Sequence, residues 1–161
     1  MKTIKYFVLG AFATTLILTL VALKAEKIST ETQSIDSLAD DRAKYLKLVR
    51  ASIKGNGKKA ADSVFKNIKI LKGMPAGQLL AVMDIAYSQS LGVSCGHCHN
   101  TSKWESDEKP QKQIAREMSI LLKKTKELIK DVKGLKSENP TINCTTCHRG
   151  AIKPALDLGE K

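Results

Sequence analysis

The chain has 161 residues, of which 42 % are hydrophobic and only 4 % aromatic, and its 27 Lys and Arg against 16 Asp and Glu give a formal charge of +11. This length excludes a large multidomain enzyme, and the scarcity of large rings suggests that something other than protein fills part of the interior. The positive charge by itself fits nucleic acid, an anionic membrane surface or an acidic protein partner.

The first residues have the pattern of an export or anchor segment. Two lysines lie in residues 1–5, and an uncharged stretch follows from Tyr6 to Leu23. This stretch reaches the ~17–25 residues that span a bilayer, and its end makes a poor cleavage site, so an uncleaved anchor is favoured over a cleaved signal. We predict an export or transmembrane segment over residues 1–24 and a polar linker over residues 25–36. An exported chain does not meet nucleic acid, which excludes that partner.

The remaining residues, 37–161, are predicted to form one small all-α domain. Apolar spacing indicates helices over about 37–53 and 60–71. Two longer helices are predicted, one from Pro75 to Ser90 and one from Pro110 to Leu135, and each begins at a proline.

The four cysteines form two CxxC pairs, each followed directly by a histidine, in CGHCH at residues 95–99 and CTTCH at residues 144–148. CxxCH is the attachment signal for c-type haem. Cysteines three residues apart lie on one side of a helical turn, where both thiols can form thioethers with one porphyrin and the histidine can ligate its iron. The sequence therefore predicts two haem c groups. The residues are Cys95, Cys98 and His99 in the first motif and Cys144, Cys147 and His148 in the second.

Zinc binding, disulfide bonds and thiol redox chemistry account less well for the cysteine pairs. A structural zinc site usually has its two pairs about 15–20 residues apart, whereas residues 99–143 separate them here. Disulfides suit an exported chain but do not explain the histidines, and a thioredoxin-like pair requires a βαβ context. The third histidine, His97, lies inside the first motif and is predicted to face solvent rather than iron.

The methionines limit the choice of the sixth iron ligand. One lies in the N-terminal segment, and Met74 lies in a turn. Met83 and Met118 each lie on the apolar face of a predicted helix that precedes a CxxCH motif. This repeated plan assigns Met83 to the haem of His99 and Met118 to the haem of His148, although a methionine on such a face more often packs in the core. His/Met ligation raises the potential and suits electron transfer.

Short segments around both motifs match one known family. They are LGV at 91–93, Asn100, Asp107, KP at 109–110, AR at 115–116, CHRG at 147–150, and VFKNI with LKG between 64 and 73. In these segments the chain resembles the photosynthetic reaction centre cytochrome c subunit family. The resemblance implies a ligating helical methionine before each motif, in agreement with Met83 and Met118. The family's subunit carries four haems, whereas this chain has two CxxCH motifs, and Thr145 stands where the family often has an aromatic residue. We therefore expect a stand-alone dihaem relative.

Charged residues near the motifs suggest further roles. Arg116 and Arg149 are candidates for pairing with haem propionates. Trp104 is predicted to pack against haem or loop. The lysines after Pro110 form either a solvated face or a docking surface. They are Lys112, Lys123, Lys124, Lys126, Lys130 and Lys133.

These patterns predict a membrane-associated dihaem cytochrome that relays single electrons between redox proteins, one of them acidic, with no chemistry on a small-molecule substrate. The expected location is the bacterial cytoplasmic membrane with the haem domain facing the periplasm, or the periplasm itself if the signal is cleaved. The alternative is a haem enzyme or sensor, such as a dihaem peroxidase, with one open iron position. That alternative requires a histidine or an empty sixth site, and the only spare histidine is His97.

Overall fold

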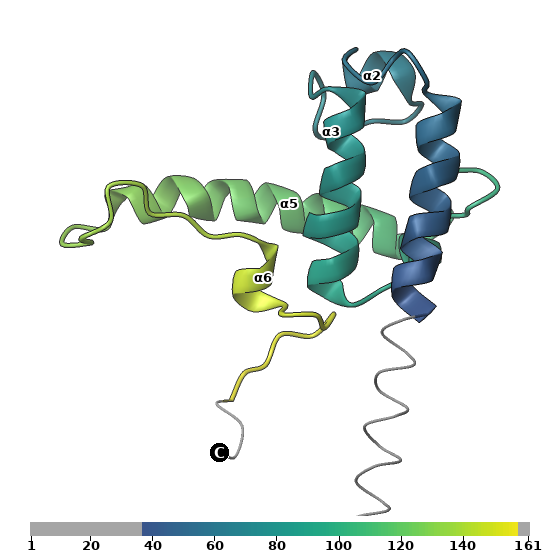
Figure 1. Cartoon of the computed structure of the whole chain (residues 1–161). Coiled ribbons are helices and arrows are strands. Elements are labelled where there is room, and N and C mark those ends of the chain that lie inside the picture. The colour runs from purple at the N-terminus through teal and green to yellow at the C-terminus, as the bar shows by residue number, and fades with distance from the viewer. Residues whose placement is uncertain (1–36, 158–161) are drawn as a thin grey trace, which may run out of the picture. The chain divides into compact units, whose positions relative to one another are not determined.

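The computed structural model describes residues 37–157, so the predicted anchor and linker lie outside the described residues (Figure 1). Within this range the chain is helical and forms no strand, and its only β interactions are isolated bridges from Ala60 to Pro75 and from Asn100 to Lys103. The predicted all-α class is confirmed. None of the helices in the described range has the length and apolar character needed to span a bilayer.

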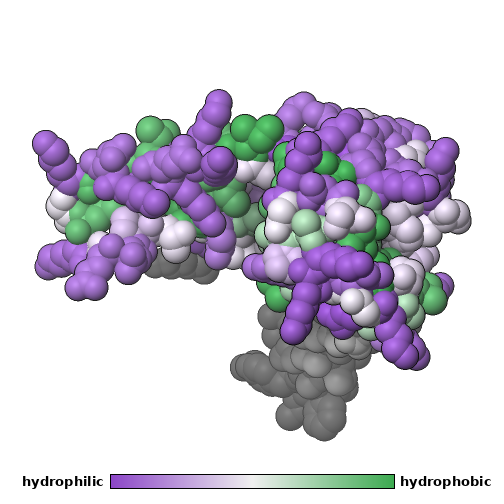
Figure 2. All heavy atoms as spheres, turned by 90° about the horizontal axis from the view of Figure 1, so that it is seen from above, coloured by the Kyte–Doolittle hydropathy of each residue, from purple (hydrophilic) through white to green (hydrophobic). Residues whose placement is uncertain are grey.

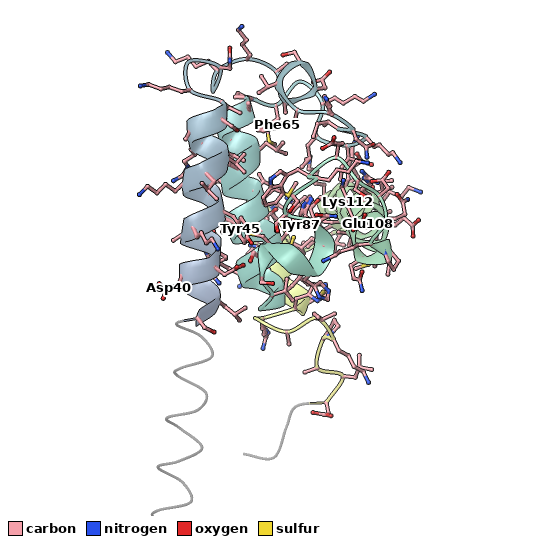
Figure 3. The ribbon with its side chains drawn as sticks, turned by 90° about the vertical axis from the view of Figure 1, so that its right-hand side faces the viewer. Asp40, Tyr45, Phe65, Tyr87, Glu108 and Lys112 are labelled. Atoms are coloured by element: carbon pink, nitrogen blue, oxygen red, sulfur yellow. The ribbon has the colours of Figure 1, made fainter. Side chains whose placement is uncertain are left out.

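Two helical segments lie side by side and carry the apolar core (Figures 1 and 3). Residues 37–52 form the first. The second consists of α3 (Ala76–Ala81) and the π-helix η1 (Val82–Gln89), and the short helix α2 (Ala61–Val64) lies at one end of the pair. The core at that end is small, and its members are Ile53, Ala76 and Leu80, with Leu46, Val49, Val64 and Phe65 packed against them.

The predicted helix from Pro75 to Ser90 is confirmed, with one local departure. Pro75 occupies the N-cap, and from Val82 the helix widens into π geometry, in which the hydroxyl of Ser90 also donates to the carbonyl of Ile85 at 3.1 Å. π-Helical turns are rare and frequently occur at functional sites. Gly92 then adopts φ 63°, a left-handed conformation that ends helices.

The helix predicted over residues 60–71 is mostly wrong, because only Ala61–Val64 is helical. Asn67 and Leu71 adopt φ 61° and 59°, and left-handed residues cannot continue a right-handed helix. The chain turns back instead, and the N–H of Gly73 donates to the Asp62 carboxylate at 2.8 Å.

The last long helix, α5 (Pro110–Leu128), begins at the predicted proline but ends earlier than the predicted Leu135. A short 3-10 turn, η2 (Ile129–Asp131), follows it. Beyond that point Val132 adopts an extended backbone with φ −73° and ψ 108°, and Gly134 adopts a left-handed φ of 87°. Neither conformation can continue a right-handed α-helix, so the apolar pattern alone does not extend the helix.

Candidate haem-binding sites

The first CxxC pair forms the short helix α4 (Cys95–Cys98), which distant side chains hold at both ends. The backbone N–H of Cys95 donates to the carboxylate of Asp41 at 3.3 Å, and the Lys109 ammonium donates to the carbonyl of Gly96. Both cysteines are partly buried, and burial raises the pKa of each thiol, with Asp41 adding to the effect at Cys95. The pair is thus presented as two neutral, unpaired thiols on a fixed turn.

His99 follows α4 and is covered by aromatic side chains. Its Nδ1 lies 3.4 Å from the carbonyl oxygen of Trp104, whose ring is tilted against the imidazole at 5.3 Å. The ring of Tyr45 packs edge-on against the Trp104 ring, with 5.6 Å between the ring centroids, and this contact holds Trp104 over His99. Burial, with the charge of Lys112, lowers the pKa of His99. A carbonyl oxygen only accepts, so the neutral ring carries its proton on Nδ1, and Nε2 keeps the lone pair that an iron ion needs.

The second CxxC pair forms α6 (Cys144–Cys147), which local sequence supports. The Asn143 side chain accepts from the backbone N–H of Thr146 at 3.1 Å, and the Thr146 hydroxyl accepts from the Asn143 N–H in a reciprocal capping box. Nδ1 of His148 lies 3.1 Å from the carbonyl oxygen of Ala151, so this histidine has the same tautomer as the first. Cys147 is exposed.

A backbone junction joins the two motifs. The N–H of Gly150, just after the second motif, donates to the carbonyl of Ser90 at 2.8 Å. A Cβ at Gly92 would lie 2.0 Å from the carbonyl oxygen of Gly150, so only glycine fits at this crossing. The turn that leads into the first motif therefore supports the turn that leaves the second.

The two methionine-bearing helices also meet. Tyr87, four residues after Met83 in η1, shares a short hydrogen bond with Ser119, the residue after Met118 in α5. Tyr87 is partly buried, which raises the pKa of its hydroxyl, and Cys144 and Cys98 lie close enough to add to this effect. Helix α4, with the first cysteine pair, contacts α5, which carries Met118, and α6, with the second pair, contacts η1, which carries Met83. Both motifs and both helices thus share one neighbourhood.

A charge cluster centred on Asp107 supports the first motif. The Asp107 carboxylate accepts from Arg116 at 2.9 Å and from Lys69 at 2.7 Å, and Lys112 lies 3.3 Å away. Hydrogen bonds from Arg116, Lys69 and Asn67 hold the pKa of this carboxyl far below its usual range. Lys112 and Arg116 are only 9 % and 7 % exposed. Lys112 is therefore not part of a solvated or docking face, and that expectation was wrong for this lysine.

Arg116 and Arg149 differ in their surroundings. Arg116 is engaged by Asp107, while Arg149 is exposed and has φ 47°. Their pairing with propionates stays a prediction. The sequence marks Asp107 only as part of a matching segment and does not reveal its partners, which lie up to 40 residues away along the chain.

Comparison with known sequences decides the family. The sequence model of the photosynthetic reaction centre cytochrome c subunit family matches residues 24–157. The chain belongs to this family. It is therefore a c-type cytochrome, a class that binds haem c covalently.

Two relatives give the extent of the similarity. Cytochrome c-554 of Chloroflexus aurantiacus is 36 % identical over 86 residues, which are 53 % of this chain and 20 % of that protein. The photosynthetic reaction center cytochrome c subunit of Thermochromatium tepidum is 30 % identical over 95 residues, 58 % of this chain and 22 % of that protein. The chain thus spans about a fifth of the length of these relatives. No solved structure matches it.

The described residues fit haem c in their donor chemistry and in their surface. Four free thiols could supply the attachment, and two histidines, each with Nδ1 next to a backbone carbonyl, could supply the axial ligand through Nε2. Figure 2 shows apolar side chains between the lysines along the α5 arm. Met118 is 42 % exposed, and the exposed residues Ile114, Leu121 and Leu128 lie on the same side of α5 as it does, at helical spacing. An apolar face of this kind suits a bound macrocycle.

A shared zinc site does not fit the geometry. Among residues 37–157 no three side chains of the types His, Cys, Asp and Glu come close enough together to hold a metal ion.

Proposed function

We propose that this cytochrome carries two covalent haems and relays single electrons between redox proteins. The observation that supports it is the repeated geometry of the two motifs, in which His99 and His148 each direct Nδ1 to a backbone carbonyl. When bound, each haem supplies a one-electron Fe(III)/Fe(II) couple. The protein's part is to attach the haems through its thiols, orient the axial imidazoles and exclude water.

The haem number is tested by intact mass after denaturation, combined with a haemochrome assay. The expected mass is that of the polypeptide plus two haems, and the double variant Cys144→Ser/Cys147→Ser should retain one. The mass of the bare polypeptide would contradict the proposal.

We assign the sixth ligands as Met83 for the His99 site and Met118 for the His148 site. The thioether favours Fe(II) more than imidazole does, so Met83→His and Met118→His should each lower one midpoint potential. Met74→Leu, in the turn before α3, is the matched control and should change neither potential. Loss of a methionine–iron charge-transfer band in Met74→Leu would contradict the assignment.

For location, we propose that segment 1–24 holds domain 37–161 on the outer face of a bacterial cytoplasmic membrane, after linker 25–36. A carbonate wash of membranes tests this, because an anchored cytochrome stays with the pellet. Release of all haem protein into the periplasmic fraction would favour a cleaved signal.

We propose that the basic side of α5 docks an acidic redox partner. Lys123 is exposed and Lys126 partly exposed, and the chain's charge of +11 can steer such a partner toward a small transient interface. Lys123→Glu/Lys126→Glu should slow electron exchange at least about tenfold at low salt, and the loss should shrink as salt rises.

The matched control reverses the same charge at the far end of the helix pair. Lys58→Glu/Lys59→Glu changes two exposed lysines in the turn before α2 and should have a smaller effect. Equal rates for both double variants would leave the α5 lysines as a solvated face.

A further inference from the structure

One carbonyl oxygen links the first axial histidine to a buried cation. The oxygen of Trp104 lies 3.4 Å from Nδ1 of His99 and accepts from the ammonium of Lys112 at 2.9 Å. Lys112 also donates to the carbonyl of Ser106 at 2.8 Å and lies 3.3 Å from the Asp107 carboxylate. Its side chain is 11 % exposed, so the charge is held in place by three acceptors and is poorly screened by solvent.

The buried charges of this cluster are positive, since Lys112 and Arg116 are buried while the carboxylates of Asp107 and Glu108 are exposed. Asp107 is the carboxylate that Lys112, Arg116 and Lys69 share, and two of these three cations are buried. The second motif has a different environment. The Ala151 oxygen that accepts from His148 receives no lysine or arginine donor from residues 37–157, and the neighbouring Arg149 is exposed.

We propose that Lys112 is a tuning residue that makes the haem attached through Cys95 and Cys98 the higher-potential member of the pair. This inference rests on the proposed function. A fixed cation stabilises the state that has gained an electron. In addition, an ammonium on the Trp104 oxygen makes that carbonyl a weaker acceptor, so His99 has less imidazolate character and is a poorer donor to ferric iron.

Burial of the site acts in the same direction. Cys95 and Cys98 are both partly buried, whereas in the second motif Cys144 is partly buried and Cys147 is exposed. A less polar surrounding favours the Fe(II) state with its lower net charge. One electron delivered by a donor protein then resides at the His99 site, while the His148 site stays ferric. A second electron is needed to fill the His148 site.

The test is a potentiometric titration of the holoprotein and of Lys112→Met, a variant that keeps the length of the side chain and removes its charge. In Lys112→Met the higher of the two midpoint potentials should fall by about 59 mV, which corresponds to a tenfold change in the one-electron reduction equilibrium. The lower potential should not change. Lys124→Met is the control. This variant removes the same charge from an exposed position on α5 that lies roughly 18 Å from Lys112 along the helix axis, so it should move neither potential.

Asp107→Asn distinguishes tuning from support of the fold. Asp107→Asn removes a negative charge beside Lys112 and should therefore raise the higher midpoint potential, whereas Lys112→Met should lower it. If both substitutions acted by loosening the loop, the higher potential would shift in the same direction in both variants. A shift of the lower potential in Lys112→Met, or shifts of equal sign in the two variants, would overturn the inference. A chain with only one covalent haem would instead contradict the proposed function itself.

Discussion

The two CxxCH motifs have the same local chemistry, but the protein supports them by different means. The first is held by residues that are distant in sequence. The carboxylate of Asp41 accepts from the backbone N–H of Cys95, 54 residues away, and the rings of Trp104 and Tyr45 pack over His99. The second is held by its own capping box, with the bond between Gly150 and Ser90 as its backbone link to the rest. The first motif is thus held by residues from several parts of the chain, while the second is held mainly by its immediate neighbours.

Hydrogen exchange of the holoprotein gives the largest test of this difference. The amides of residues 95–99 should exchange about a hundredfold more slowly than those of residues 144–148, a difference of ~3 kcal/mol in local opening. The reason is that opening the first motif breaks contacts with distant elements, whereas the second opens alone. Equal protection would mean that haem attachment alone sets local stability.

The glycine junction gives the next largest effect. Gly92→Ala places a methyl group against the Gly150 carbonyl at a left-handed position, and it should lower the free energy of unfolding by about 3 kcal/mol. Gly73→Ala is the control, because its φ of 75° is similar but nothing lies within 4 Å of the added carbon. It should cost only about 1 kcal/mol.

Denaturant unfolding monitored through the haem absorption measures both variants. A similar loss in Gly92→Ala and Gly73→Ala would show that backbone conformation alone matters and that the Gly92–Gly150 contact does not hold the second motif.

The smallest effect is expected at the second motif's cap. Asn143→Ala removes the acceptor of the Thr146 N–H and should cost ~1 kcal/mol of local stability. Exchange of residues 144–148 should therefore become about fivefold faster, with residues 95–99 unchanged. Asn143→Asp keeps the acceptor and is the control, so equal acceleration in both variants would contradict a capping role.

Periodicity predicted the long helices well. The helix from Pro75 and the start at Pro110 are encoded by apolar spacing and by proline, both of which are local signals. The end of α5 and the loop after α2 are not encoded in this way. Asn67 and Leu71 carry no glycine signal for a left-handed turn, and the apolar residues beyond Leu128 continue a helical pattern although the backbone is extended at Val132.

At the sites, the sequence predicts the cysteines and histidines that would hold haem, and it gives no signal for the contacts that surround them. CxxCH spacing is local and specific, so the cysteines and histidines could be named. Whether Met83 and Met118 ligate iron stays a prediction. The sharing of the Trp104 oxygen by His99 and Lys112 depends on the path of a loop, and no periodic pattern places a buried lysine among five exposed or partly exposed ones.

The side chains that contact the first motif all precede the second motif in the chain, so the order of synthesis affects the order in which the two motifs can fold. Every side chain shown to hold the first motif, from Asp41 to Arg116, is made before the second motif leaves the ribosome. Because chains are made and begin to fold from the N-terminus, the first site can assemble while residues 117–161 are still missing. The second motif then meets a finished partner at Ser90 and Gly92, on which its own turn closes.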